Sequence, residues 1–177
     1  MKYFYDTEFL EDGVTIELIS IGIVAEDGRE YYAVNADMRV RRVQAHSWLM
    51  ANVWPHLPTT TLGDGWATET LDREHADVKP KWQIATEVAT FLRAKGTPEL
   101  WAWYGAYDHV VLAQLFGRMI DLPHGIPMWT NDLRQEQHRL GATWMPPQPD
   151  GEHNALADAR HLRTMHEYLR QATRPRS

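Results

Sequence analysis

The sequence predicts an α/β fold in which a mixed five-stranded sheet is flanked by helices. Three strand-like segments separated by tight turns open the chain, which indicates an antiparallel meander. Helical and strand-like segments then alternate, a pattern typical of a sheet with helices on its faces. Because 44% of the 177 residues are hydrophobic, the chain can build a core, and we expect a single domain over residues 1–177.

The opening strands are short apolar segments bounded by acidic turns that contain glycine. Residues 2–10 (KYFYDTEFL) predict the first strand and residues 15–24 (TIELISIGIV) the second, with a turn at residues 11–13 between them. Residues 30–34 (EYYAV) predict the third strand, after a hairpin turn at residues 26–28.

The second strand carries apolar residues on both of its faces. Strict alternation places Ile16 and Leu18 on one face. It places Ile19, Ile21 and Ile23 on the other face. Because both faces are apolar, we expect this strand to be covered on both sides and to lie in the centre of the sheet.

The rest of the chain alternates helical and extended segments, with one polar interruption. Pro80 suits the first position of a helix, and residues 96–98 (GTP) end that helix. Residues 58–79 are polar and rich in turn-forming residues, which predicts a loop. The expected order is helix 41–57, loop 58–79, helix 80–95, strand 99–104, helix 106–116, strand 128–131, helix 133–140, a proline-rich loop at 146–151 and helix 154–172.

Composition excludes several kinds of protein. The formal net charge is −6, which argues against binding of nucleic acid through bulk positive charge. The chain has no cysteine, which excludes disulfides, thiolate zinc sites and cysteine nucleophiles. An acid at position 6 interrupts any signal-peptide core, and no stretch approaches the ~20 apolar residues of a membrane span. We expect a soluble, cytoplasmic protein with no membrane contact.

Acidic residues occupy positions where apolar residues are expected. Asp6 and Glu8 are two residues apart in the first strand, so both carboxylates lie on one face. That face also carries Phe4 and Leu10. Two acids among apolar neighbours repel each other and resist the loss of water. An edge strand with a solvated face would explain this pair on its own.

Two more acids lie on the apolar faces of predicted helices. Asp108 shares a face with Val111 and Leu112. Asp158 shares a face with Leu162 in the last helix. Capping of a helix N-terminus would explain either acid alone. Four converging carboxylates need cations, however, and hard oxygen ligands favour Mg²⁺ or Mn²⁺ over zinc.

A histidine stands beside the last of these acids. His153 precedes Asp158 by five residues, at the junction of the proline-rich loop and the last helix. With an unperturbed pKa near ~6.5, a histidine can accept a proton from water near neutral pH. We therefore take His153 as a candidate general base. The remaining histidines are expected in surface or packing roles, with His109 next to Asp108 as a supporting residue.

The ordered set of motifs resembles a known family. Asp6-Thr7-Glu8, then Asp108 within WYGAYDHVVL, then His153 and Asp158 within HNALAD resemble the DEDDh family of 3′–5′ exonucleases. MKYFYDTEF and GEHNALADAR are further similar to the small actinobacterial exoribonucleases described as ribonuclease AS. The resemblance implies a ribonuclease H-like fold. It also implies hydrolysis of phosphodiester bonds at 3′ ends with two Mg²⁺ ions, for which Mn²⁺ can substitute, and release of nucleoside 5′-monophosphates.

The resemblance also implies a role for each site residue. Asp6 would bind both metal ions. Glu8 and Asp158 would hold the ion beside the attacking water, and Asp108 would support the other ion. His153 would take the proton from that water. Two ions ~4 Å apart stabilise the attacking and the leaving oxygen of such a displacement.

The sequence departs from the family pattern at two places near the expected substrate. Phe9 and Leu10 follow Glu8 where many relatives continue with Thr-Thr-Gly. Tyr104 replaces an asparagine four residues before Asp108. We take Phe9, Leu10 and Tyr104 as candidates for contacting the 3′-terminal nucleotide. Proofreading-type binding of DNA is not carried over to this chain.

The expected substrate is RNA with single-stranded 3′ ends or overhangs, including adenylate-rich ends, and family analogy implies a homodimer. The chain has eight Trp and seven Tyr, and aromatic side chains suit such ends because every base can stack. We expect Trp82, Trp101 and Trp103 in the core. Two alternatives stay open: a 3′–5′ exonuclease that acts on DNA or on both DNA and RNA, and a catalytically weak ribonuclease H-like module that binds nucleic acid.

Basic residues gather at two places in the chain. Both clusters are expected to be solvated surface and not tracks for phosphates, so a second subunit would help to supply positive charge. The clusters are Arg39, Arg41 and Arg42 in one place, and Arg170, Arg174 and Arg176 in the other.

Overall fold

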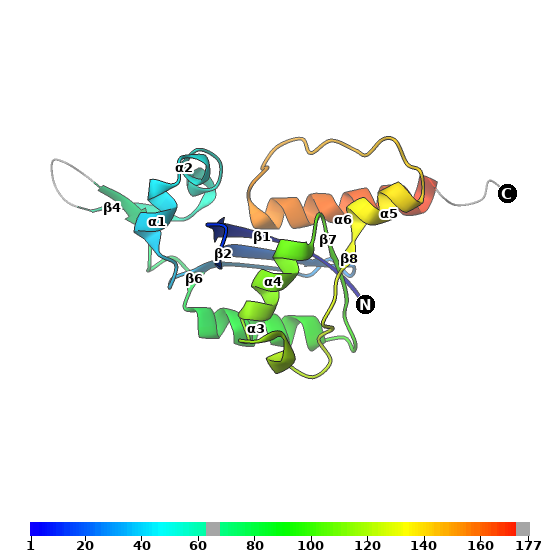
Figure 1. Ribbon diagram of the computed structural model, residues 1–177, viewed down its shortest axis with the longest axis horizontal. Coiled ribbons are helices and arrows are strands. Elements are labelled where there is room, and N and C mark those ends of the chain that lie inside the picture. Colours follow the sequence, from blue (N-terminus) through cyan, green and yellow to red (C-terminus); the bar gives the residue numbers. More distant parts are fainter. Residues whose placement is uncertain (63–67, 173–177) are drawn as a thin grey trace.

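The structure is a computed structural model, and it describes residues 1–62 and 68–172. Within these residues, six strands form one sheet in the order β6-β3-β2-β1-β7-β8 (Figure 1). The predicted α/β class is confirmed, and the arrangement is compatible with a ribonuclease H-like fold. The strands are β1 (Lys2–Glu11), β2 (Ile16–Ala25), β3 (Glu30–Asn35), β6 (Val78–Lys79), β7 (Glu99–Ala102) and β8 (Asn131–Asp132).

The three opening strands form the predicted antiparallel meander. β1 pairs with β2 and β2 with β3, both antiparallel, whereas β7 joins β1 and β8 joins β7 in parallel. The expected five-stranded sheet gains a sixth strand, because β6 pairs in parallel with β3 through Val78 and Val34. β6 lies inside the predicted loop, and its two residues are too few to produce a strand pattern in the sequence.

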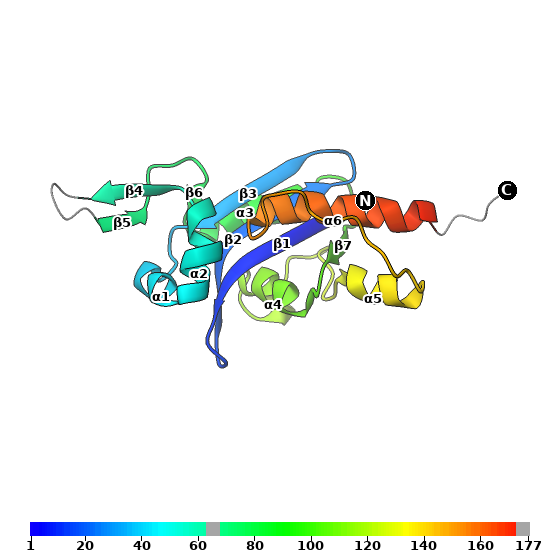
Figure 2. The same cartoon turned by 90° about the horizontal axis from the view of Figure 1, so that it is seen from above.

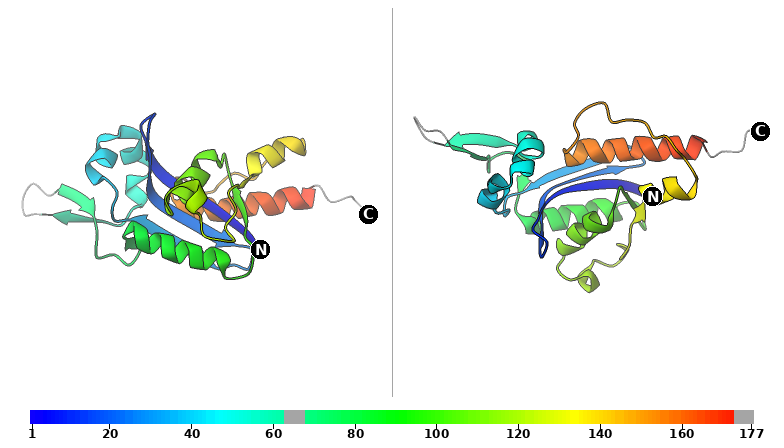
Figure 3. Two further views of the ribbon diagram at one scale, coloured as in Figure 1. Left: turned by 60° about the horizontal axis from the view of Figure 1, so that its bottom comes forward. Right: turned by 45° about the horizontal axis from the view of Figure 1, so that its top comes forward.

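The same segment also forms a two-stranded ribbon of β4 (Thr59–Leu62) and β5 (Thr68–Leu71). Figure 3 shows this ribbon projecting from one end of the molecule. The loop prediction is wrong for these strands, because the β-branched threonines of β4 suit an extended backbone. Residues 63–67 of the predicted loop lie outside the described residues.

A β-bulge between β1 and β2 changes which residues share a face. The pairing register jumps from Ser20 to Leu18 along β2, so Ile19 has no partner on β1. Leu18 and Ile21 consequently pack in the same core cluster, while Ile19 packs in a cluster across the sheet. The predicted alternation is wrong here because a strict period of two ignores the extra residue.

Helices cover both faces of the sheet (Figures 1 and 2). α3 and α4 lie on one face, and α6 lies on the other together with α1 and α2. Clusters of buried apolar side chains fill the space between the sheet and these helices. The helices are α1 (Val40–Ala45), α2 (Ser47–Asn52), α3 (Lys81–Arg93), α4 (Ala106–Gln114), α5 (Leu133–Arg139) and α6 (Ala155–Ala172), with short 3-10 helices η1 (Trp54–His56) and η2 (Met119–Asp121).

The predicted helix over 41–57 is divided into α1, α2 and η1. His46 breaks it, because its backbone is extended and its ring Nδ1 accepts a hydrogen bond from the N–H of Leu49 at 3.3 Å. This contact caps the start of α2. The predicted strand at 128–131 also shifts, since the structure places β8 at Asn131–Asp132.

The three tryptophans expected in the core differ in their burial. Trp101 and Trp103 are half-buried and pack against the apolar cluster beneath α6. The prediction is wrong for Trp82, whose side chain is 69% exposed on the outer face of α3. Among the helices that the structure describes, none combines the length and the apolar character needed to cross a membrane.

Two of the three arginines in the basic cluster near α1 form ion pairs. Arg39 Nε lies 2.8 Å from Glu17 Oε2, and Arg42 Nη2 lies 2.6 Å from Asp12 Oδ2. Such exposed pairs stabilise a fold only slightly, in agreement with the surface role expected for this cluster. Of the second cluster, the residues within 173–177 lie outside the part of the chain that the structure describes.

Candidate active site

The candidate site lies at the edge of β1 where β7 separates from it. The pairing of the two strands ends at Phe4 and Trp101. Beyond that point the first turn of α4 approaches β1, and the N–H of Thr7 donates a hydrogen bond to Asp108 Oδ1 at 2.9 Å. A helix therefore takes the place of a neighbouring strand, and it brings an acid to the strand edge.

All five residues predicted for the site line one pocket of about 280 Å³. β1 supplies Asp6 and Glu8. Asp108 lies in the first turn of α4, and Asp158 lies in the first turn of α6, just after His153. The lining is completed by Thr7, Phe9, Trp103, Tyr104 and Tyr107.

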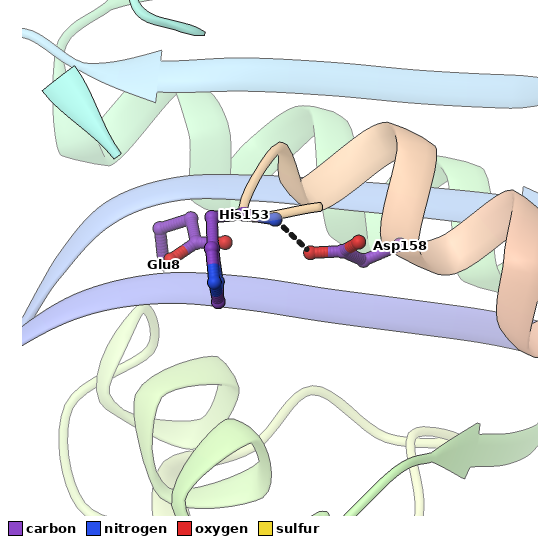
Figure 4. Close-up of side chains that lie close together, drawn as sticks. All are labelled: Glu8, His153 and Asp158. Carbon is purple, nitrogen blue, oxygen red and sulfur yellow. Dashed lines mark hydrogen bonds between the residues drawn. The ribbon is translucent and has the colours of Figure 1, made fainter. Parts of the chain in front are cut away.

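Three of these side chains are close enough to share a cation. Within the described residues, Glu8, His153 and Asp158 form the one group of three whose ligand atoms all lie within 4.8 Å of one another (Figure 4). Asp6 and Asp108 line the same pocket outside this group. Two carboxylates and an imidazole offer oxygen and nitrogen ligands, so the group could hold a divalent metal ion.

Asp158 is held through both of its carboxylate oxygens. The backbone N–H of His153 donates to Oδ2 at 2.9 Å (Figure 4), and Nε2 of Gln148 donates to Oδ1 at 2.6 Å. Gln148 lies in the proline-rich loop, and the sequence reasoning assigned it no role. The sequence feature that could have pointed to Gln148 is its position between Pro147 and Pro149, in a stiff segment close to His153.

Asp108 is held by a residue between the two acids of the first motif. Thr7 donates both its N–H, at 2.9 Å, and its hydroxyl, at 2.7 Å, to Oδ1 of Asp108. Thr7 and Asp108 are both buried, so these bonds compensate part of the lost hydration of the carboxylate. Both of these bonds go to Oδ1, so Thr7 fixes the orientation of the carboxylate through one oxygen.

The electrostatics of the site oppose four ionised carboxylates. Burial raises the pKa of Glu8 to about 8, and the charges of Asp158 and Asp108 add to the shift. Burial, together with the other three acids, holds the pKa of Asp6 well above its usual range. Burial and mutual repulsion therefore disfavour the ionised forms of both carboxyl groups, and a bound cation would offset this.

The two helical acids show the same tendency. Burial raises the pKa of Asp108 to about 6, although its hydrogen bonds with Thr7 act in the opposite direction. Burial also raises the pKa of Asp158, against the bonds from Gln148 and His153. Among the described residues, no lysine or arginine lines the pocket, and His153 is the one basic side chain beside these acids. The donor set therefore fits divalent cations.

Two pocket residues hold strained backbone conformations. His153 has φ +66° and Tyr104 has φ +53°, in the left-handed region that residues other than glycine rarely adopt. The ring of His153 also packs edge-on against Trp48 of α2, with 4.8 Å between the ring centroids. Such strain persists where surrounding contacts enforce it and is common at functional sites. Trp48 was missed by the sequence reasoning, because it lies far from His153 in the chain.

The residues predicted to contact substrate do not all reach the pocket. Phe9 lines it and stacks on Tyr107, with ring centroids 5.8 Å apart and an interplanar angle of 11°. Tyr104 also lines the pocket and is 63% exposed. Leu10 is instead buried in the core cluster with Val34, so the structure does not bring it to the pocket. It lies beyond the bulge at Glu8, where β1 passes beneath α1 and α2.

Residues 1–170 match the sequence model of the family described as the 3′-5′ exoribonuclease Rv2179c-like domain. The chain belongs to this family. Two similar proteins, both from Mycobacterium tuberculosis, are 3′-5′ exoribonuclease Rv2179c (strain ATCC 25618 / H37Rv) and 3′-5′ exoribonuclease MT2234.1 (strain CDC 1551 / Oshkosh). Each is 49% identical over 162 residues, which cover 90% of this chain and 88% of the relative.

The Rv2179c-like match includes every element that supplies the pocket. β1, α4 and the first turn of α6 all fall within residues 1–170. Family membership and the geometry of the pocket therefore concern the same part of the chain.

The raised pKa values predict how pH and metal affect stability. The pKa of Glu8 rises from its usual 4.5 to about 8 in the folded protein. The folded state therefore holds its proton more tightly than the unfolded chain does, and the free energy of unfolding falls as pH rises between these values. A cation that replaces the proton should stabilise the protein most at high pH.

Thermal melting checks this expectation. Mg²⁺ should raise the melting temperature more at about pH 8.5 than at about pH 5.5, relative to matched samples in EDTA. Glu8→Gln should reduce the difference between the two pH values, whereas the exposed Glu74→Gln should leave it unchanged. Equal Mg²⁺ shifts at both pH values would contradict the expectation.

Proposed function

We propose that this chain is a 3′–5′ exoribonuclease that removes nucleotides from single-stranded RNA 3′ ends or overhangs, including adenylate-rich ends. Two Mg²⁺ ions, with Mn²⁺ as a substitute, would support hydrolysis that releases nucleoside 5′-monophosphates. The observation that carries the proposal is the meeting of Asp6, Glu8, Asp108, Asp158 and His153 in one pocket that no lysine or arginine of the described residues lines. Membership of a family described as exoribonucleases supports the same reaction.

In this proposal the four carboxylates hold the metal ions. Bound divalent cations would stabilise the negative charge that develops on the attacking and leaving oxygens of a phosphoryl displacement. Glu8 and Asp158 lie within reach of one cation, together with His153. Asp6 shares the pocket with Asp108, whose carboxylate is held by Thr7 through Oδ1.

His153 acts as the general base. The hydrogen bond from its backbone N–H to Asp158 and the contact of its ring with Trp48 restrict where the imidazole can lie. A neutral imidazole near the metal ligands can remove a proton from an attacking water. His153→Ala would then lower the rate and leave the carboxylate ligands in place.

Single-stranded ends suit the aromatic wall of the pocket. Phe9, Trp103, Tyr104 and Tyr107 line it, and each offers a π face on which a base can stack. The proposal for RNA over DNA rests on the relatives, whose names describe exoribonucleases. The proposal includes DEDDh-type chemistry and a homodimer, as the family resemblance implies. It also includes one exonuclease domain over residues 1–177 and a cytoplasmic location, which chain length and composition favour.

A degradation assay tests the proposed function. RNA and DNA oligonucleotides of one sequence, labelled at the 5′ end, are incubated with the protein in Mg²⁺ and in EDTA. A ladder that shortens from the 3′ end of RNA in Mg²⁺ alone is the expected result. Preference for DNA would overturn the RNA assignment, and no cleavage of either would favour a binding module. A comparison of adenylate and uridylate tracts tests the base preference.

A further inference from the structure

An RNA strand whose 3′ end lies in the pocket must leave it along the protein surface. Three hollows adjoin the pocket and offer such a path. The first, of about 290 Å³, lies between the β1–β2 turn and α4 and shares Tyr107 with the pocket. The second, of about 380 Å³, runs along α6 and shares four residues with the pocket: Asp6, Trp103, His153 and Asp158. The third, of about 420 Å³, lies against α5 and shares Tyr104.

The charges of the three hollows differ. Each phosphodiester of the strand carries a negative charge, so a path along the surface favours cationic side chains. The first hollow is lined by Glu11 and has no basic residue, and the second carries Glu152 beside its histidines. The third hollow is lined by Arg134 and His138. It is the one hollow of the three with an arginine in its wall.

The guanidinium of Arg134 is not engaged elsewhere. Within the described residues its side chain makes no ion pair or hydrogen bond, whereas Arg139 on the same helix binds Glu136 at 2.7 Å. His138 follows Arg134 by four residues in α5, so the two side chains lie on one face of the helix. An unpaired arginine is well suited to a phosphate, because its planar group donates several hydrogen bonds.

Asp132 lines the same hollow, and its carboxylate already accepts hydrogen bonds from backbone N–H groups. Asp132 accepts hydrogen bonds from the N–H groups of Arg134 and Gln135, at 2.8 and 3.2 Å, and from Gly105 at 3.0 Å. The last of these bonds joins the start of α5 to the turn that carries Tyr104. The arginine is thereby held beside the mouth of the pocket, and the negative charge of Asp132 is partly compensated by backbone donors.

We propose that the hollow between Tyr104 and α5 binds the RNA backbone upstream of the scissile bond, with Arg134 contacting a phosphodiester there. This inference rests on the proposed function and adds the direction in which the strand leaves the pocket. A dinucleotide contains one phosphodiester, the scissile one. Arg134 therefore has a ligand only in substrates of three or more nucleotides.

Substrate length gives the test. Arg134→Ala should raise KM about tenfold for a 12-nucleotide RNA, as expected for one charged hydrogen-bonding contact, and leave kcat and all constants for a dinucleotide unchanged. The slope of log KM against log salt concentration should decrease by about 0.7 for the long RNA. Arg134→Lys should retain most of that slope. Arg41→Ala removes an exposed arginine that, like Arg134, makes no ion pair within the described residues, and it should change neither quantity.

The outcomes separate this inference from the proposed function. If Arg134→Ala raises KM or lowers kcat equally for the dinucleotide and the long RNA, Arg134 has a structural role and the inference is overturned. An unchanged KM for long RNA would also overturn it, whereas inactivity of the unmodified protein on every RNA would overturn the proposed function. Fluorescence anisotropy in the Asp108→Asn background, with Mg²⁺ present, then measures binding of the 12-nucleotide RNA without turnover. If the affinity for the 12-nucleotide RNA is the same with and without Arg134→Ala, the inference is also overturned.

Discussion

Replacement of Asp6 by asparagine is expected to lower kcat for RNA by about 10³-fold or more and, in the absence of metal, to raise the melting temperature. Asp6 is proposed to hold both cations, and the loss of several kcal/mol of charge stabilisation corresponds to such a factor. The same carboxyl group has its pKa raised by burial and by Asp108, Glu8 and Asp158. A neutral amide of nearly the same shape removes this repulsion, so the metal-free fold should gain stability.

Single-turnover kinetics and thermal melting in EDTA check the two effects together. A gain of about 1 kcal/mol corresponds to roughly 2–4 °C in a chain of this size. Glu74→Gln removes an exposed acid outside the pocket and should change neither rate nor melting temperature. A near-normal rate for Asp6→Asn would remove Asp6 from the ligand set. A lowered melting temperature would instead show that its carboxylate stabilises the fold without metal.

The four acids of the candidate site could be picked out because each of them breaks a local pattern, whereas His153 was found from its place beside Asp158. Asp6 and Glu8 share one face of a strand, and their neighbours Phe4 and Leu10 on that face are buried. Asp108 occupies a buried position on the inner side of a helix. These signals depend on the periods of strands and helices, which a few neighbouring residues reveal.

The contacts that hold these acids could not be predicted in the same way. Thr7 and Asp108 are 101 positions apart, and their hydrogen bonds depend on how α4 meets the edge of β1. The bond from Gln148 to Asp158 depends on the path of the proline-rich loop. The spacing of neighbouring residues in the sequence does not indicate either contact, because the tertiary structure brings the two partners together.

The errors in the fold also arise where pairing overrides local pattern. β6 has two residues and exists because Val78 pairs beside Val34. Strict alternation predicts that Ile19 shares a face with Ile21, but it does not, because the pairing of β2 with β1 contains a bulge at Ile19. Long segments with clear periods, such as α3 and α6, were placed within a few residues of their bounds.

Gly22→Ala is expected to impair stability and activity together, because it acts on the contact that positions α6. Gly22 pairs with Asp6 across β1 and β2. A Cβ at Gly22 would lie 2.3 Å from the backbone C and O of Ala155 and 2.4 Å from Cα of Leu156. These are backbone atoms in the first turn of α6, so no side chain can rotate to relieve the clash.

The helix must therefore move away from β2 as a unit. That first turn carries Asp158, and His153 leads into it, so the shift displaces two site residues relative to Asp6 and Glu8. A displacement of about 1 Å can lower a rate about 10²-fold. Overpacking of this kind also costs about 1–3 kcal/mol, which corresponds to a fall in melting temperature of roughly 2–12 °C.

Gly28→Ala provides the matched control. Gly28 lies in the β2–β3 turn with φ +90° and nothing within 4 Å of an added Cβ, so alanine there strains the backbone without displacing an element. Gly28→Ala should lower the melting temperature, as Gly22→Ala does, but it should leave kcat unchanged because the turn is not part of the site. Both variants are assayed at a temperature well below their melting transitions, so that unfolding does not contribute. If kcat of Gly22→Ala equals that of Gly28→Ala, close packing of α6 on β2 does not set the geometry of the site, and the loop before α6 must position His153 and Asp158 by itself.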